Sequence, residues 1–183
     1  KATDAFNVSH VEMLGYEADD LIASYAKAAI DEQMRVTIVS SDKDLMQLVR
    51  EDVSMLDTMK NRLINKKEVI EKFGVEPDRV IDVQSLAGDS VDNIPGVPGI
   101  GIKTASLLIN EYNNLDNLLE KASNIKQNKR RESLIEFADQ ARLSRKLVTL
   151  KEDIELPIPI KNIEIQSINP EKLISFLKGM EFK

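Results

Sequence analysis

The stretch that decides the fold class is residues 17–45, EADDLIASYAKAAIDEQMRVTIVSSDKDL. Apolar residues in its first half recur at helical spacing, so we expect an amphipathic helix over residues 18–33. The β-branched run Val36–Val39 then has the composition of a short buried strand. A second helix is expected over residues 45–49. Helix, strand and helix with short connections predict a parallel-type α/β sheet covered by helices.

The flanking sequence extends this pattern in both directions. Before it, residues 11–14 have the composition of a short strand. After it, residues 53–57 and 63–65 are expected to form a small hairpin or edge strands. Beyond these the texture is helical apart from a Pro/Gly-rich turn, and the helices are expected at residues 66–73, 78–87, 103–112, 115–122, 131–147 and 170–177.

Composition excludes several kinds of site. The chain has 183 residues, 42% of them hydrophobic, which is enough apolar material for a real core. It has no cysteine, so disulfides, thiolate metal sites and cysteine nucleophiles are excluded, and His10 is its single histidine. No run approaches the roughly 20 apolar residues that span a bilayer, and we expect neither a signal peptide nor a membrane partner.

Charge is distributed unevenly along the chain. The formal net charge of −6, taken alone, disfavours nucleic acid as a partner, because phosphates attract Lys and Arg. Residues 1–102, however, carry 11 basic and 19 acidic side chains, whereas residues 103–151 carry 10 basic and 6 acidic ones. An acidic part followed by a basic part is more informative than the net charge.

Carboxylates gather in three short clusters. They are Glu17, Asp19 and Asp20 in the first turn of the first helix, Asp42 and Asp44 after the strand, and Asp89 and Asp92 before the Pro/Gly turn. Each cluster also has a structural interpretation, as acids at a helix N-terminus, as a helix cap or as turn residues. The second cluster has the best functional position, because open α/β sheets bind ligands beyond the carboxyl ends of their strands.

Seven carboxylates in a chain without cysteine indicate hard-cation chemistry. Oxygen ligands suit Mg²⁺ or Mn²⁺, and so many acids in one site would repel one another without bound metal. Two such ions about 3.5–4 Å apart can activate water and stabilise the leaving oxygen of a phosphodiester. We therefore predict two divalent cations, Mg²⁺ or Mn²⁺, provided that the three clusters converge in space.

The segment 94–105, IPGVPGIGIKTA, is the most specific local motif. Gly99 and Gly101 open a helix whose first turn contains Lys103 and Thr104. Glycine allows close approach of the backbone to a phosphate, and the helix N-terminus offers unpaired N–H donors. A plain Gly-rich helix connection is the structural alternative. We favour a hairpin between two helices that binds the DNA backbone.

Basic residues follow this hairpin. Charge runs are often only solvated faces, but here they would extend a track for duplex DNA through non-specific phosphate contacts. The residues are Lys126, Lys129, Arg130, Arg131, Arg142, Arg145 and Lys146.

Four segments taken together resemble the 5′-nuclease domains of bacterial DNA polymerase I, within the flap endonuclease family. They are GYEADD at residues 15–20, SDKDL at 41–45, GDSVDNIPG at 88–96 and GIGIKTA at 99–105, in the order and spacing of that family. The resemblance covers nearly the whole chain. It implies a PIN/flap-nuclease-like α/β core with a helix-hairpin-helix-like DNA-binding subdomain.

The resemblance also implies roles for individual residues. Glu17, Asp19, Asp20, Asp42, Asp44, Asp89 and Asp92 match the family's metal-binding carboxylates, and Glu17, Asp19, Asp42 and Asp44 are the expected catalytic residues. Gly99, Gly101, Lys103 and Thr104 match its DNA-binding hairpin. Backbone carbonyls of Val97 and Ile100 would hold a potassium ion that bridges to a phosphate.

One departure concerns the amino-terminal side. The family begins with a strand ending in a metal-binding Asp, a further aspartate strand and a helical arch, and nothing before Glu17 matches them. We therefore expect an amino-terminally shortened domain with impaired catalysis. Residues 1–87 would be the C-terminal part of the nuclease core, 88–151 the helical DNA-binding subdomain, and 152–183 an extension packing back on the domain.

The leading functional hypothesis is a structure-specific 5′ nuclease, a 5′-3′ exonuclease or flap endonuclease of replication and repair. Its expected partners are 5′ flaps, nicked or gapped duplexes, RNA primers and the polymerase part of the same parent chain. We expect a monomer in the bacterial cytoplasm, at the nucleoid. The alternatives are a DNA-binding module without catalysis and a metal-dependent phosphatase acting on small molecules.

Overall fold

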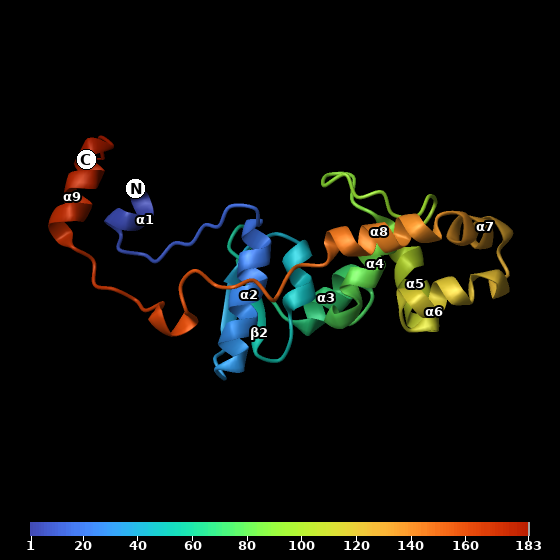
Figure 1. Cartoon of the computed structure of the whole chain (residues 1–183). Coiled ribbons are helices and arrows are strands. Elements are labelled where there is room, and N and C mark those ends of the chain that lie inside the picture. The colour runs from blue at the N-terminus through green and yellow to red at the C-terminus, as the bar shows by residue number, and fades with distance from the viewer. Residues whose placement is uncertain (183) are drawn as a thin grey trace.

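The computed structural model describes residues 1–182, which form an elongated molecule (Figure 1). Its middle is an α/β part with a short sheet beside α2, and its largest extension is a helical part built from α4 to α8. Two short helices near the chain ends, α1 and α9, contact each other at the opposite extremity (Figure 1). This arrangement confirms the predicted α/β core with a helical subdomain.

The α-helices account for most of the regular structure. Their bounds are α1 Ala2–Ala5, α2 Ala18–Asp31, α3 Lys66–Phe73, α4 Val80–Ala87, α5 Ile102–Tyr112, α6 Leu115–Glu120, α7 Asn128–Glu136, α8 Ala138–Val148 and α9 Pro170–Gly179. Short 3-10 helices connect them at η1 Asp44–Leu48, η2 Pro77–Arg79, η3 Ala122–Asn124 and η4 Ile160–Asn162.

The sheet of the described chain has three strands in the order β1-β2-β3, namely Val36–Val39, Val53–Asp57 and Arg62–Ile64. β1 and β2 are parallel, as predicted, and β2 and β3 form the predicted hairpin, so the sheet is mixed. The turn between β2 and β3 is too short for a crossover, so the pair must be antiparallel. Asp57 fixes this turn, because its Oδ1 accepts the backbone N–H groups of Met59 and Lys60 at 3.0 and 3.2 Å.

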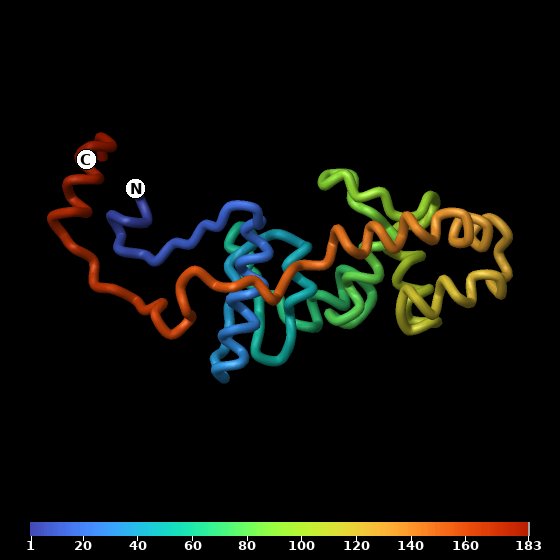
Figure 2. Tube along the Cα trace, viewed as in Figure 1, coloured from blue at the N-terminus to red at the C-terminus, as the bar shows by residue number. Residues whose placement is uncertain are grey.

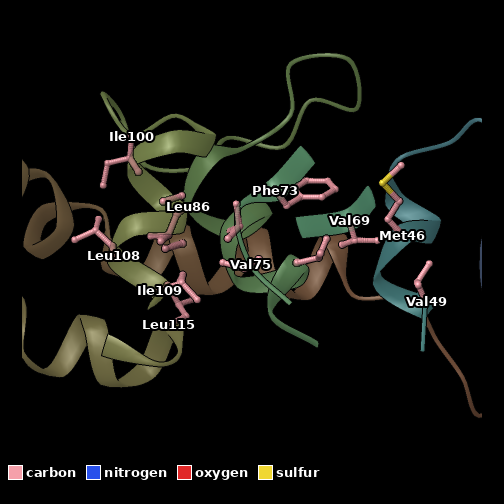
Figure 3. Close-up of a cluster of buried hydrophobic side chains, with 14 of the residues drawn as sticks. Met46, Val49, Val69, Phe73, Val75, Leu86, Ile100, Leu108, Ile109 and Leu115 are labelled. Atoms are coloured by element: carbon pink, nitrogen blue, oxygen red, sulfur yellow. The ribbon is translucent and has the colours of Figure 1, made fainter. Parts of the chain in front are cut away.

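One hydrophobic core runs through both parts. Figure 3 shows it extending from Met46 and Val49, beside the sheet, past Phe73 to Leu86 and Leu115 in the helical part. Phe73, Leu86 and Leu115 are at most 1% exposed. Burying side chains of this size stabilises the fold by roughly 1.5–3 kcal/mol each. The two parts therefore hold each other in a fixed geometry.

Three expectations about local structure were wrong in detail. Residues 11–14 form no strand and pair with no strand of the described sheet. Residues 45–49 are largely 3-10 helix rather than α-helix. The single helix expected over residues 131–147 is two helices that break at Phe137. Since α7 contacts η3 and α8 contacts α4, one straight helix could not serve both neighbours.

The chain returns to the α/β part after α8. Residues 150–158, the return segment, pass back alongside α2 (Figure 2). The Ser24 hydroxyl donates to the Lys151 carbonyl at 3.0 Å and accepts from the Ile154 amide at 3.3 Å. The Tyr25 hydroxyl donates to the Ile158 carbonyl at 2.8 Å. Among residues 1–182, no helix combines the length and apolar character needed to cross a bilayer.

Candidate nuclease site

An acidic pocket of about 470 Å³ lies beyond the carboxyl end of β1. Its walls bring together carboxylates from three separate segments of the chain, which is the convergence that the sequence left open. Apolar side chains from the hairpin region and from the end of α8 complete the pocket. The carboxylates that line it are Glu17, Asp19, Asp42, Asp44 and Asp92.

The turn after β1 places Asp42 and Asp44 by local hydrogen bonds. The Asp42 amide donates to the Ser40 hydroxyl, and Asp42 Oδ1 accepts from the Asp44 amide, each at 3.0 Å. Asp42 therefore forms a side-chain turn that precedes the 3-10 helix η1, whose N-cap is Lys43 and not the expected Asp. The side chains of Asp42 and Asp44 also line the pocket, so a local structural role and a functional role are compatible here.

Asp89 and Asp92 reach the site on a tight loop. Asp89 and Ile94 exchange backbone hydrogen bonds of 2.9 and 2.7 Å, and Asp89 Oδ1 accepts the Val91 amide at 2.9 Å. The base of the loop closes where Gly88 and Gly96 meet backbone to backbone. A Cβ on Gly88 would lie 2.7 Å from the Ile94 carbonyl oxygen, and both glycines have positive φ. Only glycine fits this contact.

Asp44, Asp89 and Asp92 form the tightest carboxylate group of the described chain. One oxygen from each lies within 4.8 Å of one oxygen of the other two. The Lys43 ammonium forms an ion pair with Asp89, which lowers the pKa of Asp89 and raises that of Lys43. One cation of the protein thus already offsets part of the negative charge.

The remaining charge is not offset. Burial raises the pKa of Asp44, and the neighbouring Asp42 and Asp92 raise it further against the lowering effect of a hydrogen bond from Gln84. Burial, and then the charges of Asp42 and Asp44, raise the pKa of Asp19. These carboxylates are thus held close together at a cost in free energy, and a bound cation would relieve that cost.

Two of the seven predicted carboxylates, Asp20 and Asp89, do not line the acidic pocket. Asp89 pairs with Lys43, whereas Asp20 Oδ1 accepts the backbone amide of Lys151 at 2.9 Å. Asp20 therefore ties the return segment to the first turn of α2. Glu17, by contrast, is the exposed N-cap residue of that helix and lines the pocket.

The donor set fits divalent cations. Every charged group that lines the pocket is a carboxylate, and oxygen donors of this kind are the ligands of hard cations such as Mg²⁺ and Mn²⁺. Burial first, and repulsion by neighbouring carboxylates second, raise the pKa values of Asp19 and Asp44, and a bound cation would offset both effects. The residues present therefore fit a divalent metal centre.

The second predicted site, the glycine hairpin, is built from backbone. The Val97 carbonyl accepts the Ile100 amide at 3.1 Å, and the side chains of both residues are buried. Gly99 has φ +79°, and no atom lies within 4 Å of where a Cβ would be on Gly99 or Gly101. Gly101 is the N-cap of α5. The hairpin thus presents bare backbone to the outside.

Side chains next to the hairpin are basic. Lys103 is exposed in the first turn of α5, and Thr104 beside it is half-buried. A second pocket, of about 410 Å³, runs from the hairpin to the start of α7. Its lining residues are Pro98, Gly99, Ile100, Gln127, Lys129, Arg130 and Ser133.

The predicted basic track is only partly available. Arg145 forms two hydrogen bonds with Asp116, at 2.8 and 3.1 Å, and Arg142 pairs with Asp139 at 2.8 Å. Arg131 donates to the Ile125 carbonyl and to Asn128. The guanidinium groups of these three arginines are thus bound to groups within the helical part, which they help to stabilise. Within residues 1–182, no ion pair engages Lys126, Lys129, Arg130 or Lys146.

Two family models match consecutive parts of the chain. Residues 1–74 match the N-terminal resolvase-like domain of 5′-3′ exonucleases, and residues 75–171 match their C-terminal SAM fold. The chain belongs to the 5′-3′ exonuclease family.

Curated relatives agree with this assignment. DNA polymerase I of Rhizobium leguminosarum is 54% identical over all of this chain, and that of Bacillus subtilis is 38% identical over 98% of it. A 5′-3′ exonuclease of Aquifex aeolicus is 37% identical over 94% of this chain. The chain spans 18% and 21% of the two polymerases and 58% of the exonuclease.

Solved structures show the same fold. The bacteriophage T5 5′-exonuclease with bound zinc ions has a TM-score of 0.70 and 26% identity, covering 92% of this chain and 60% of its own. The T5 flap endonuclease in complex with DNA and metal ions has a TM-score of 0.69 and 26% identity, covering 74% of this chain and 50% of its own. The Rad2 catalytic core with DNA, 14% identical with a TM-score of 0.62, shares the fold. Its match covers 97% of this chain and 61% of its own.

Two residues of this family member contribute to the site without having been predicted. Lys43 stands between Asp42 and Asp44 in the quoted motif, where the alternation of acid and base could have suggested an internal counter-charge. Gln84 lies in α4, whose sequence is VIDVQSLA, and donates to Asp44. No local pattern marks Gln84, because its partner is 40 residues away in sequence.

Proposed function

We propose that this chain is the 5′ nuclease domain of a DNA polymerase I, a structure-specific 5′-3′ exonuclease or flap endonuclease. Its proposed substrates are 5′ flaps, nicked or gapped duplexes and RNA primers, and its other partner is the polymerase part of the same parent chain. The protein is proposed to act as a monomer. The observation that carries this proposal is the convergence of carboxylates from three chain segments on one pocket beyond β1.

The proposed metal ligands are Glu17, Asp19, Asp20, Asp42, Asp44, Asp89 and Asp92. Two bound Mg²⁺ or Mn²⁺ ions would activate water and stabilise the leaving oxygen of a phosphodiester. The protein's part is to hold the catalytic carboxylates Glu17, Asp19, Asp42 and Asp44 in place. Local hydrogen bonds do this for Asp42 and Asp44, and the closed base of the Asp89–Ile94 loop places the further proposed ligands Asp89 and Asp92.

The hairpin would hold the DNA backbone some distance from the cutting site. Gly99, Gly101, Lys103 and Thr104 are proposed to contact phosphates, and the carbonyls of Val97 and Ile100 to hold a K⁺ ion beside them. Bare amides at a helix N-terminus and a nearby ammonium suit a phosphate. Lys129 and Arg130, across the 410 Å³ pocket, would extend this contact.

The three-part organisation expected from the sequence is proposed here as well. Residues 1–87 would carry five of the seven metal ligands together with α4, 88–151 the other two, Asp89 and Asp92, and the DNA-binding subdomain, and 152–183 the extension. The family models place their own junction earlier, between residues 74 and 75.

Asp42→Asn tests the proposal in the full-length protein. With Mg²⁺ or Mn²⁺ and labelled 5′-flap DNA, we expect cleavage to fall at least about 100-fold, more than the loss of an outer-sphere partner costs. Asp52→Asn is the matched control, because Asp52 is exposed in a turn outside the pocket, and it should cleave normally. Cleavage by Asp42→Asn at the wild-type rate would contradict the proposal.

The same assay separates the alternative functions. If the unaltered protein binds flap DNA with metal present but forms no product, it is a DNA-binding module. If it hydrolyses a chromogenic phosphate monoester and shows no salt-sensitive affinity for duplex DNA, it is a phosphatase. Product release from flap DNA, together with salt-sensitive binding, supports the nuclease.

A further inference from the structure

Gln84 is a buried amide in contact with the metal-site carboxylates. It lies on α4, is only 4% exposed, and its Nε2 donates to Asp44 Oδ1. Its Oε1 is the one buried side-chain oxygen or nitrogen without a hydrogen-bond partner among residues 1–182. One of the two Nε2–H groups is therefore used by Asp44, whereas the amide oxygen is unused inside the protein.

Stability does not explain an amide at this position. Its neighbours on α4, Val80, Val83 and Leu86, are fully buried and apolar. A buried polar group with an unsatisfied oxygen is costly, whereas an apolar side chain of similar volume would pack there without that cost. The benefit of Gln84 must therefore lie in what its Nε2 does for Asp44.

The hydrogen bond fixes Asp44 from the helical side. Asp44 is held from its own segment through the Asp42 contact to its amide, but that bond leaves the carboxylate free to rotate. Gln84 engages one carboxylate oxygen and so limits this rotation. Asp44 is also the member of the Asp44–Asp89–Asp92 group that comes from the α/β part, whereas the other two come from the loop after α4.

Within the group, Asp89 and Asp44 are each bound by a different side chain of the protein. Asp89 is paired with the Lys43 ammonium, whose positive charge opposes binding of a cation at the same place. The Gln84 amide is neutral and orients Asp44 without that opposition. An uncharged donor is the kind of outer partner that orients a metal-binding carboxylate while leaving its charge available.

We propose that Gln84 is a positioning residue that orients the Asp44 carboxylate for a divalent cation. This inference rests on the proposed function, because it takes Asp44 to be a metal ligand. Gln84 itself need not touch metal or substrate. Its effect should therefore appear in metal affinity and should depend on Asp44.

The test is Mn²⁺ binding to the 183-residue chain by isothermal titration calorimetry, with thermal unfolding in EDTA measured alongside. Gln84→Leu should weaken Mn²⁺ binding about 10- to 100-fold, the usual effect of losing an outer partner. Its melting temperature in EDTA should be equal to or above the wild-type value, because the unsatisfied amide oxygen is gone. A structural role alone would lower the melting temperature and leave the affinity of the folded protein unchanged.

Ser85→Ala is the matched control. Ser85 is the next residue on α4, is fully buried, and its hydroxyl donates to the Ile81 carbonyl at 2.6 Å, away from the carboxylates. Its Mn²⁺ affinity should stay within about twofold of wild type. An equal loss in both variants would mean that any disturbance of α4 weakens the site, which overturns the proposal.

A double-mutant cycle shows whether Gln84 acts through Asp44. On the Asp44→Asn background, adding Gln84→Leu should change Mn²⁺ affinity by less than about twofold, because the carboxylate it orients is absent. A full additional loss would contradict a positioning role. If Gln84→Leu does not fold, Gln84→Met, which is flexible and fills similar space, replaces it, and failure of both to fold overturns the proposal.

The two proposals fail in different ways. Wild-type Mn²⁺ affinity in a folded Gln84→Leu chain would overturn the role of Gln84 and leave the nuclease proposal intact. Absence of Mn²⁺ binding by the unaltered chain, or of flap cleavage by the unaltered full-length protein, would instead count against the proposed function.

Discussion

The acidic pocket and the glycine hairpin are only a few residues apart in sequence, yet they are built in opposite ways. The pocket is made of side chains that come from three segments and repel one another. The hairpin is one continuous segment that offers backbone groups, with its apolar side chains buried beneath. The pocket, which we propose to bind cations, holds like charges close together, whereas the hairpin, which we propose to bind phosphates, exposes amides at little electrostatic cost.

Gly96→Ala should have the largest effect on stability, because Gly96 joins the two regions. A Cβ there would lie 2.7 Å from Gly88 Cα and closer still to the Gly88 amide nitrogen, at a φ of +61°. Overpacking and the left-handed backbone together should cost about 2–5 kcal/mol in the free energy of unfolding. Urea denaturation measures this loss.

Gly99→Ala is the control for that prediction. Gly99 also has positive φ, but its Cβ would meet open space. We expect a loss of only about 1 kcal/mol. Equal losses for the two variants would show that backbone conformation alone, and not the Gly88 contact, makes the junction sensitive.

Lys103→Ala should affect DNA binding and leave the acidic pocket untouched. We expect duplex affinity to fall about three- to tenfold for all sequences, and the slope of log affinity against log salt to decrease by about 1. Fluorescence anisotropy at several KCl concentrations measures both. Lys121→Ala, an exposed lysine at the end of α6, should leave the slope unchanged, and an unchanged slope for Lys103→Ala would break the proposed division between the two regions.

Substitutions of Asp20 test whether this acid supports the return segment or binds metal as the pocket carboxylates are proposed to do. Asp20→Ala removes the acceptor for the Lys151 amide and should lower the free energy of unfolding by about 1 kcal/mol. Asp20→Asn keeps an acceptor oxygen and should recover most of that loss in thermal unfolding. If Asp20→Asn weakens Mn²⁺ binding as much as Asp19→Asn does, the main role of Asp20 is ligation rather than support of the return segment.

Asp44→Asn should slightly stabilise the chain in EDTA, by about 0.5 kcal/mol at pH 7 after allowance for solvent screening. The folded-state pKa of Asp44 lies above its ordinary value of 3.8, so its ionised form disfavours folding. Stability is therefore lost as pH rises from 3.8 through the folded pKa, and the variant avoids this loss.

Thermal unfolding between pH 3.5 and 7 checks this sign. The two proteins should melt together at the acidic end and diverge toward neutrality. In Mn²⁺ the order should reverse, because the wild type gains the binding energy. A destabilised Asp44→Asn chain in EDTA at pH 7 would show that the pocket does not store repulsion.

The contrast between a hairpin built from one segment and a pocket built from three explains which features could be predicted from the sequence. The hairpin, the strand Val36–Val39 and the helix predicted over residues 18–33 depend on local spacing, and the structure has them there, with the helix ending at Asp31. The three acid clusters were also recognisable, but their convergence depends on the shared core around Phe73 and Leu86. Gln84 and the internal pairing of Arg145 with Asp116 depend on partners far away in sequence, so no local pattern revealed them.

The return segment attaches the end of the helical part to the α/β core, and this affects where insertions can be tolerated. The chain enters the helical part beside the α/β core at η2 and leaves it at residues 149–151, which Ser24 and Asp20 attach to the same core. The helical part is therefore an outgrowth with both ends anchored. Residues inserted in the exposed connection at 126–127 would lengthen its far end without moving a carboxylate. The length of the proposed DNA-binding part can thus change independently of the proposed cutting site.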